Sequence, residues 1–237
     1  MKLRLAMQST LLILFTSGCV TVGEEPKVSA APVDAADTRI ELGLAYMKRE
    51  QYSRAKQDFE KALEFAPKYY RAHLSMAYYF EAVGEFKHAS DAYRTALKVA
   101  PNSGEVYHHY GTFLCKRSEY EQAEALLVAA TQQPNYYQIA ESYENAGLCA
   151  LKAGQPNTAK AYFIKSLEHS PLRPNSTIQL AALEVKDGEY QQARMRLMKF
   201  HQRYGYQTPS LSILSELELK EGNTSMAEKY QRLLTDQ

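Results

Sequence analysis

The chain has 237 residues, and its 28 Lys and Arg residues against 27 Asp and Glu residues give a formal net charge of +1. A nucleic-acid-binding protein usually carries a basic patch or stripe, so this charge balance gives no indication of a nucleic-acid partner. The chain has 18 Tyr and no Trp, and structural packing is the expected role of most of these tyrosines.

The amino terminus has the pattern of a secretory signal. A basic start and a mostly apolar run to Thr16 precede Ser17-Gly18-Cys19. The run is shorter than the about 20 residues that a membrane-spanning helix needs, so we expect a cleaved signal over residues 1–18. A cysteine directly after Ser-Gly resembles the lipobox of bacterial lipoproteins, although Thr16 stands where Leu is usual. The alternative is an ordinary signal peptide with a chance cysteine.

The lipobox resemblance implies that Cys19 becomes the lipidated first residue of the mature protein. Two or more acyl chains give stable membrane anchoring. Val20 follows, where Asp would retain a lipoprotein at the inner membrane. The resemblance therefore implies a protein anchored by its lipid in the outer membrane and facing the periplasm. Residues 19–35 contain Pro26 and Pro32 and show no helical period, so we expect them to form a flexible tether.

Six copies of one pattern follow the tether. An alanine recurs at intervals of 34, 34, 36, 34 and 34 residues, and a small residue stands twelve positions before each copy. A helix–turn–helix unit of about 34 residues is typical of the tetratricopeptide repeat. The pattern predicts an all-α superhelical solenoid, a class of binding scaffold with a concave surface. The expected domain covers residues 36–237, with repeats at 36–69, 70–103, 104–137, 140–173, 174–207 and 208–237.

The period lengthens by two residues between repeats three and four, where Pro134 comes one position early. We interpret this as a local change of curvature and not as a domain boundary.

Cys115 and Cys149 lie in the first helices of repeats three and four. The two extra residues between these repeats could place the two cysteines at the same height along the neighbouring helices. A periplasmic protein can keep a disulfide, which requires a Cα separation of about 4.4–6.8 Å. Two buried free thiols are the alternative, and a metal site with His108 matches no known zinc spacing.

The concave surface should be lined by fixed positions in the first helix of each repeat. In repeats one and two these positions give an apolar strip with charged residues, namely Ile40, Leu44, Met47, Lys48, Arg71, Leu74, Tyr78 and Glu81. Repeat three contributes Glu105, His108, Thr112, Cys115 and Lys116, and repeat four contributes Glu141 and Glu144. An exposed apolar strip is a common form of peptide site, so we place the partner on repeats one and two. The alternative is that Ile40 and Leu74 only pack locally.

A lysine recurs at the thirteenth position of five repeats, in Lys48, Lys116, Lys152, Lys186 and Lys220. Such a column could hold the carboxylate of a bound peptide. However, it lies at the carboxyl end of a helix, where the helix dipole favours a cation, and no asparagine column accompanies it. We therefore interpret the lysines as helix-end residues.

The third and fourth repeats carry more than the generic pattern. Residues 107–115 read Tyr-His-His-Tyr-Gly-Thr-Phe-Leu-Cys, and residues 145–149 read Asn-Ala-Gly-Leu-Cys. With the lipobox and six repeats, the chain resembles over essentially its whole length the type IV pilus biogenesis/stability lipoproteins of the PilF/PilW family. His109 departs from the polar residue, such as Asn, expected there. The resemblance implies a pilotin, an outer-membrane lipoprotein that binds the pilus secretin and promotes its localisation and multimer assembly.

The rival function is that of a tetratricopeptide lipoprotein adaptor for another envelope machine, in outer-membrane protein insertion or cell-wall synthesis. No nucleophile–base pair, metal motif or phosphate loop stands out in the sequence. We therefore expect no enzyme activity, no cofactor and no small-molecule substrate. The expected partner is a protein, and the expected membrane contact is the lipid on Cys19.

Overall fold

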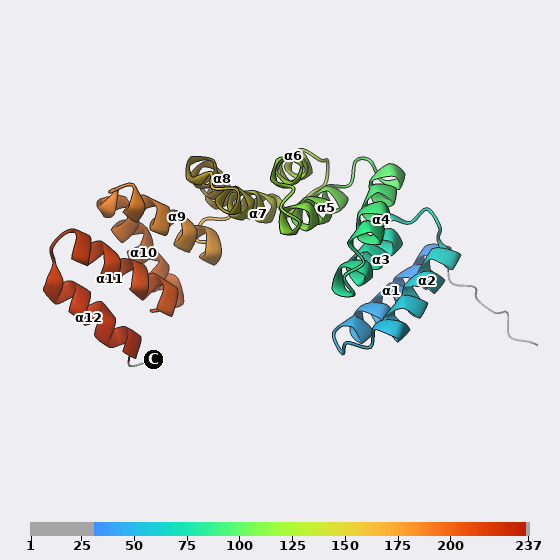
Figure 1. The fold of residues 1–237 in the computed structure, drawn as a ribbon, viewed down its shortest axis with the longest axis horizontal. Coiled ribbons are helices and arrows are strands. Elements are labelled where there is room, and N and C mark those ends of the chain that lie inside the picture. The colour runs from blue at the N-terminus through green and yellow to red at the C-terminus, as the bar shows by residue number, and fades with distance from the viewer. Residues whose placement is uncertain (1–30, 236–237) are drawn as a thin grey trace, which may run out of the picture.

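The structure is a computed structural model that describes residues 31–235, and these residues form twelve α-helices and no strands. Consecutive helices pack as antiparallel pairs, and the pairs follow one another in a curved row (Figure 1). The expected all-α superhelical solenoid is therefore confirmed. The helices are α1 Pro32–Met47, α2 Tyr52–Phe65, α3 Tyr70–Ala82, α4 Phe86–Val99, α5 Gly104–Lys116, α6 Tyr120–Thr131, α7 Ile139–Lys152, α8 Pro156–His169, α9 Pro174–Lys186, α10 Tyr190–Tyr204, α11 Thr208–Lys220 and α12 Thr224–Thr235.

The recurring small residues explain why the two helices of a pair approach so closely. The periodic alanines of the second helices, from Ala55 to Ala227, are completely buried. A Cβ atom added at Gly43 would lie 2.3 Å from the Phe59 ring, and one at Gly147 would lie 2.7 Å from the Phe163 ring. Each large ring therefore fills the space that its partner glycine leaves open. This pairing of small and large residues fixes the helix–helix distance within a repeat.

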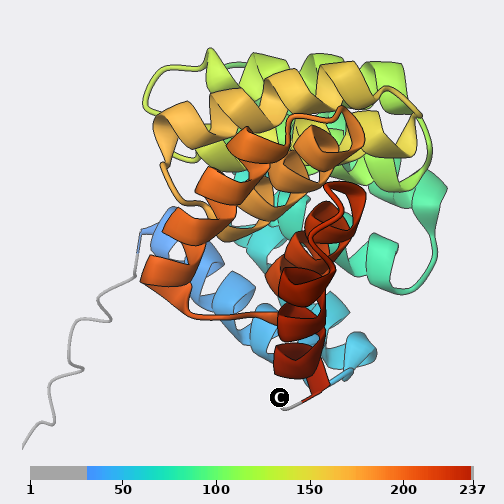
Figure 2. The ribbon, with the colours of Figure 1, turned by 90° about the vertical axis from the view of Figure 1, so that its left-hand side faces the viewer.

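The row of pairs bends into an arc. In Figure 1, α5 and α7 lie on the inner side of the arc, and α6 and α8 lie on its outer side. Figure 2 shows the same row end on, with the last pair in front of the earlier ones. The first helix of each pair therefore faces the hollow of the arc, which is the arrangement that a concave binding surface requires.

The first helix begins earlier than the sequence suggested. Residues 32–35, which were expected to belong to the tether, are the first turn of α1. Pro32 stands at the first helical position, where its missing N–H is not needed and its fixed φ suits a helix. The proline therefore starts the helix and does not extend the tether. The expected signal peptide, Cys19 and tether residues 19–30 lie outside the described residues.

The two extra residues between repeats three and four lie in the loop from 132 to 138. Tyr136 turns back from this loop and covers Gly104 at the start of α5. A Cβ atom on Gly104 would lie only 2.4 Å from the Tyr136 ring. The longer connection is therefore packed against the third repeat, with no break in the helical row. Between residues 31 and 235, none of the helices has the length and apolar character needed to cross a membrane.

Candidate functional site

A groove of about 380 Å³ lies between α1, α3 and α5, and Tyr93 of α4 also lines it. Six of the eight residues expected from repeats one and two line this groove, as do three of those expected from repeat three. The full lining is Ile40, Leu44, Arg71, Leu74, Ser75, Tyr78, Glu81, Tyr93, Glu105, His109, Thr112 and Lys116.

The apolar strip is less exposed than the sequence suggested. Ile40 is 2% exposed and Leu74 is 8% exposed, and both belong to hydrophobic clusters of the core. They form the floor of the groove, because each also packs against the neighbouring repeat. Tyr78 is 48% exposed and Leu44 is partly exposed. These two side chains therefore offer most of the apolar surface that a partner could cover.

Two of the expected groove residues lie elsewhere. Met47 is buried in a cluster with Ala55, Phe59 and Met76, where it fills the junction between repeats one and two. Lys48 caps the end of α1 and is exposed, but it does not line the groove. The prediction of a groove role was therefore wrong for both residues. Met47 is covered by Met76 and Tyr79 of the next repeat.

The charged residues of the groove are paired with one another or with neighbouring side chains. Arg71 lies 3.1 Å from Asp37, and Lys116 lies 3.0 Å from Glu81, measured between the nearest nitrogen and oxygen atoms. Tyr70 donates a 2.9 Å hydrogen bond to Glu105. Partnered charges of this kind leave the groove with an apolar centre and a polar rim of balanced charge. The groove therefore suits a largely neutral segment with apolar side chains.

At the third repeat the concave surface becomes polar and the groove ends. His108, which was expected to line the groove, is buried and shares a 2.8 Å hydrogen bond with Ser142. Ser142 in turn shares a 2.7 Å hydrogen bond with Tyr136 from the inserted loop. Burial, together with smaller contributions from the charges of His109 and Arg173, lowers the pKa of His108 to about 4. His108 is therefore neutral near pH 7 and ties α5 to α7.

The fourth repeat places a carboxylate where the second repeat has an apolar side chain. Glu144 is buried and accepts hydrogen bonds of 3.0 Å from the backbone N–H of Ser176 and of 2.6 Å from its hydroxyl. The Nε atom of Arg173 lies 3.0 Å from the same carboxylate oxygen. The Glu144 carboxylate therefore does not give the concave surface the acidic character that was expected. It holds repeats four and five together inside the protein.

Cys115 and Cys149 form a disulfide that joins α5 and α7, with a Cα separation of 5.7 Å. Both sulfur-bearing residues are buried. Cys115 was also expected to line the groove, but the bond turns it toward the fourth repeat. The disulfide fixes the first helix of repeat three to that of repeat four.

Sequence reasoning missed three of the lining residues, Ser75, Tyr93 and His109. Tyr93 comes from a second helix, yet its hydroxyl donates a hydrogen bond to Glu81 at the groove. Its ring stacks on Tyr110 with centroids 5.3 Å apart. The register of the first helices cannot reveal such a residue. The available signal was a Tyr in a column that holds Phe or Leu in four of the other five repeats, since a buried Tyr hydroxyl needs a partner.

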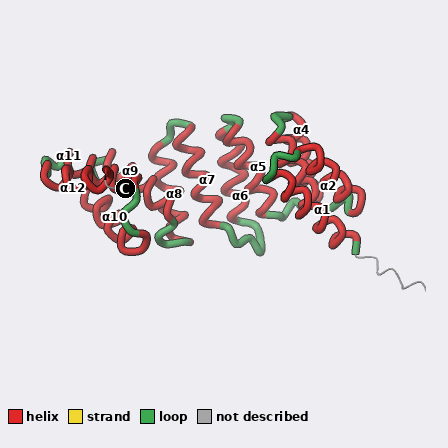
Figure 3. The backbone as a smooth tube through the Cα atoms, turned by 90° about the horizontal axis from the view of Figure 1, so that it is seen from below, coloured by secondary structure: helices red, strands yellow, loops and turns green. Residues whose placement is uncertain are grey.

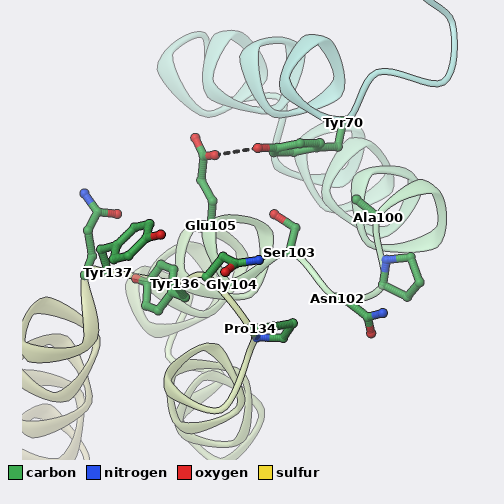
Figure 4. Close-up of a pocket in the computed structure, with 12 residues that line it drawn as sticks. Tyr70, Ala100, Asn102, Ser103, Gly104, Glu105, Pro134, Tyr136 and Tyr137 are labelled. Atoms are coloured by element: carbon green, nitrogen blue, oxygen red, sulfur yellow. Dashed lines mark hydrogen bonds between the residues drawn. The ribbon is translucent and has the colours of Figure 1, made fainter.

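A second cavity, of about 550 Å³, lies at the ends of the helices and not between their inner faces (Figure 4). Loops before and after repeat three form it, and Tyr70, Glu105, Tyr136 and Tyr137 are among its lining residues. Figure 4 shows the Tyr70 hydroxyl meeting the Glu105 carboxylate on one side, while Tyr136 and Tyr137 lie on the other. No group of three or more His, Cys, Asp or Glu residues between 31 and 235 could hold a metal ion.

Comparisons with known proteins agree on the fold and on one biological process. Models of the tetratricopeptide repeat match residues 36–69 and 140–171. The type IV pilus assembly protein PilF of Pseudomonas aeruginosa is 36% identical over 203 residues, which cover 85% of this chain and 81% of that protein. An uncharacterized protein of Haemophilus influenzae is 36% identical over 119 residues, which cover 50% of this chain and 66% of the relative.

Solved structures give the same result. The structure of Pseudomonas aeruginosa PilF aligns with a TM-score of 0.76 and 33% identity, covering 87% of this chain and 93% of that one. The crystal structure of PilW, described as a widely conserved type IV pilus biogenesis factor, aligns with a TM-score of 0.72 and 28% identity, covering 85% and 92%. YrrB, a tetratricopeptide protein at 17% identity and a TM-score of 0.60, shares the fold.

Proposed function

The chain belongs to the family of tetratricopeptide-repeat proteins of type IV pilus biogenesis, and we propose that within this process it acts as a pilotin. In this role it is an outer-membrane lipoprotein, anchored through Cys19 and facing the periplasm. It captures the pilus secretin and promotes the localisation and multimer assembly of the secretin in the outer membrane. The protein works as a scaffold and not as an enzyme.

The groove on repeats one to three is the observation that carries this proposal. It combines an apolar floor at Ile40 and Leu74 with an accessible aromatic ring at Tyr78. Hydrophobic contacts between a groove and alternate side chains of a helix or strand are a common mode of peptide recognition. Covering one exposed apolar side chain contributes about 1.5–3 kcal/mol. A secretin segment with two or three apolar side chains therefore fits this groove.

The test compares two variants whose altered side chains are similarly exposed. Tyr78 is 48% exposed inside the groove, and Leu219 is 52% exposed on α11, away from it. Tyr78→Glu places an uncompensated charge in the groove and should reduce secretin capture about tenfold or more, since about 1.4 kcal/mol corresponds to a factor of ten. Leu219→Glu should leave capture unchanged. Capture is measured as secretin co-purified from detergent-solubilised envelope, together with the yield of secretin multimer.

Leu74→Glu is a poor substitute for this experiment. Leu74 is a core residue as well as a groove residue, so a carboxylate there would destabilise the fold and confuse the result. Equal secretin capture by Tyr78→Glu, Leu219→Glu and the unaltered protein, with unchanged thermal melting, would show that the groove is not the binding site. Capture of a different envelope assembly protein in place of the secretin would favour the adaptor function.

Anchoring through Cys19 is supported by the Ser17-Gly18-Cys19 pattern. We expect Cys19→Ala to abolish lipidation and fractionation with the outer membrane, while residues 31–235 keep their fold. Secretin should then accumulate as monomer or in the inner membrane. Metabolic labelling with a clickable fatty acid gives the readout, and a labelled Cys19→Ala protein would contradict the lipobox.

A further inference from the structure

The solenoid has two edges, and they differ in chemistry. The first, here called the loop edge, consists of the connections between repeats, residues 66–69, 100–103, 132–138, 170–173 and 205–207. The second, here called the turn edge, consists of the turns within repeats, residues 48–51, 83–85, 117–119, 153–155, 187–189 and 221–223. Because the two helices of each repeat are antiparallel, successive connections of one kind follow the same edge of the row.

Charge separates the two edges. The loop edge contains no Asp or Glu, and it carries Lys68 and Arg173. Five of the six turns on the turn edge contain at least one carboxylate. The amino-terminal turns of the inner helices bring four carboxylates close to this edge. Asp37 pairs with Arg71 at 3.1 Å, Glu105 with Tyr70 at 2.9 Å and Glu141 with Arg173 at 4.0 Å, whereas Asp34 is exposed. Glu64 and Glu168 lie farther from these loops, in the last turns of outer helices.

Exposed aromatic and apolar side chains gather on the loop edge. Tyr137 is 90% exposed at the rim of the cavity in Figure 4. Leu172 and Tyr206 are also exposed, and so is Tyr204 at the adjoining end of α10. The Tyr204 hydroxyl donates a 3.0 Å hydrogen bond to the Leu172 carbonyl, which places these two residues side by side. Tyrosine combines an apolar ring with a polar tip, a combination enriched at membrane–water interfaces.

The described chain begins on this same edge. The amino end of α1 points the same way as the amino ends of α7 and α9, which directly follow loops of the loop edge. Figure 3 shows the start of α1 and the loop between α6 and α7 on the same side of the row. Twelve residues separate Cys19 from Pro32. At about 3.3–3.6 Å per residue, such a segment spans at most about 45 Å.

We propose that the loop edge is a membrane-facing surface that rests on phospholipid headgroups, with Tyr137, Leu172, Tyr204 and Tyr206 at the interface. The lack of carboxylates in its loops avoids repulsion by anionic lipids. Lys68 and the exposed Arg203, in the last turn of α10 beside the loop edge, add attraction. An edge-down orientation leaves the groove between α1, α3 and α5 open to the side, where a protein partner can enter. This inference goes beyond secretin binding and shares with the proposed function only the anchor at Cys19.

A single tryptophan tests the orientation cleanly, because the chain contains none. Tyr137→Trp places the reporter on the loop edge, and Phe86→Trp places it at an exposed position beside the turn edge. Each full-length lipidated protein is incorporated into vesicles of phosphatidylethanolamine and phosphatidylglycerol, with or without brominated acyl chains. We expect brominated lipid to quench most of the Tyr137→Trp emission and the emission maximum to shift to shorter wavelength. The Phe86→Trp protein should show neither effect.

Two measurements separate this inference from the proposed function. Vesicle flotation reports anchoring, and secretin capture is assayed in detergent without vesicles. A Tyr137→Trp protein that floats without quenching overturns the loop-edge proposal while the anchor stands, and failure to float with no quenching overturns both. Quenching of Phe86→Trp to the same extent would also contradict the proposed orientation. A blue shift of Tyr137→Trp only when secretin is added would assign the loop edge to a protein partner instead.

Discussion

Repeats two and four place opposite kinds of side chain at the same register position. The fifth residue of repeat two is Leu74, which forms part of the groove floor. The fifth residue of repeat four is Glu144, which is bonded to Ser176 of repeat five and to Arg173 in the loop before it. Repeats one and two therefore keep this position apolar, with Ile40 and Leu74 in the groove floor. Repeats three and four use it, through His108 and Glu144, to join successive repeats.

The same contrast appears at the eleventh position. Repeat two has Phe80 there, whereas repeats five and six have the buried carboxylates of Glu184 and Glu218. Arg196 binds Glu184 through two nitrogens, and Arg194 lies 2.9 Å from Glu218. Buried Glu–Arg pairs thus take the eleventh position in the C-terminal repeats, whereas repeat two keeps it apolar. Repeat one has a buried pair of its own, Arg39 with Asp58 at 2.9 Å, but neither residue lines the groove. A partner-binding role fits the half whose accessible surface is not already committed to such pairs.

Among the substitutions that test this contrast, removal of one ion-pair partner should lower the free energy of unfolding the most. Arg196→Ala leaves Glu184, whose side chain is 2% exposed, without its cation. Loss of one member of a buried pair lowers the free energy of unfolding by about 3–5 kcal/mol, and the lower end applies because Arg196 is partly exposed. Urea unfolding measures the change. Lys199→Ala, an exposed substitution on the same helix, is the control and should change stability by less than about 0.5 kcal/mol.

A double variant sharpens the same test. Replacing both partners, as Glu184→Met with Arg196→Met, removes the buried charge along with its cation. Such replacements are often neutral or stabilising, so the double variant should regain most of the stability lost in Arg196→Ala. A double variant as unstable as the single one would show that the pair is needed for more than charge compensation.

The disulfide lies on the border between the two halves and should have the next largest effect. Its two cysteines are 34 residues apart in sequence, and replacing both with Ala should lower the free energy of unfolding by about 2–4 kcal/mol. Stability in a repeat array is the sum of repeat and interface contributions. We therefore expect the halves to unfold in two separated denaturant transitions. A reducing agent should reproduce this in the unaltered protein and have no effect on the Ala variant.

The pH dependence of His108 is the smallest of these effects. Its pKa falls from 6.5 to about 4 on folding, so below pH 6.5 the unfolded chain takes up a proton that the folded protein refuses. Stability is therefore full above pH 6.5 and decreases as the pH falls toward 4, by at most about 3 kcal/mol.

His108→Gln retains a hydrogen-bonding side chain near Ser142 but cannot titrate. Its stability should decline less than that of the unaltered protein between pH 6.5 and 4.5, as measured by urea unfolding at each pH. Parallel curves for the two proteins would mean that His108 does not stay neutral in the folded state.

Much of the candidate site followed from the register of the repeats. Positions counted from the start of each repeat located Leu44, Arg71 and Tyr78, because a helix presents every third or fourth residue to one side. The same counting failed for Met47, which fills the junction with repeat two. It also failed for Tyr93, which reaches the groove from a second helix. Both errors arise because register gives the direction of a side chain but not the identity of the residue that meets it.

The sequence by itself determined the solenoid, because small and large residues recur with a period that only stacked helix pairs satisfy. It also placed both cysteines in adjacent first helices. Only the tertiary structure decided which apolar positions are core and which remain accessible, because that depends on how closely the next repeat approaches. Likewise, no one-dimensional pattern shows that Glu144 meets Ser176, or that loops distant in sequence form one edge without carboxylates. Such groupings exist only after the helices have stacked into the arc.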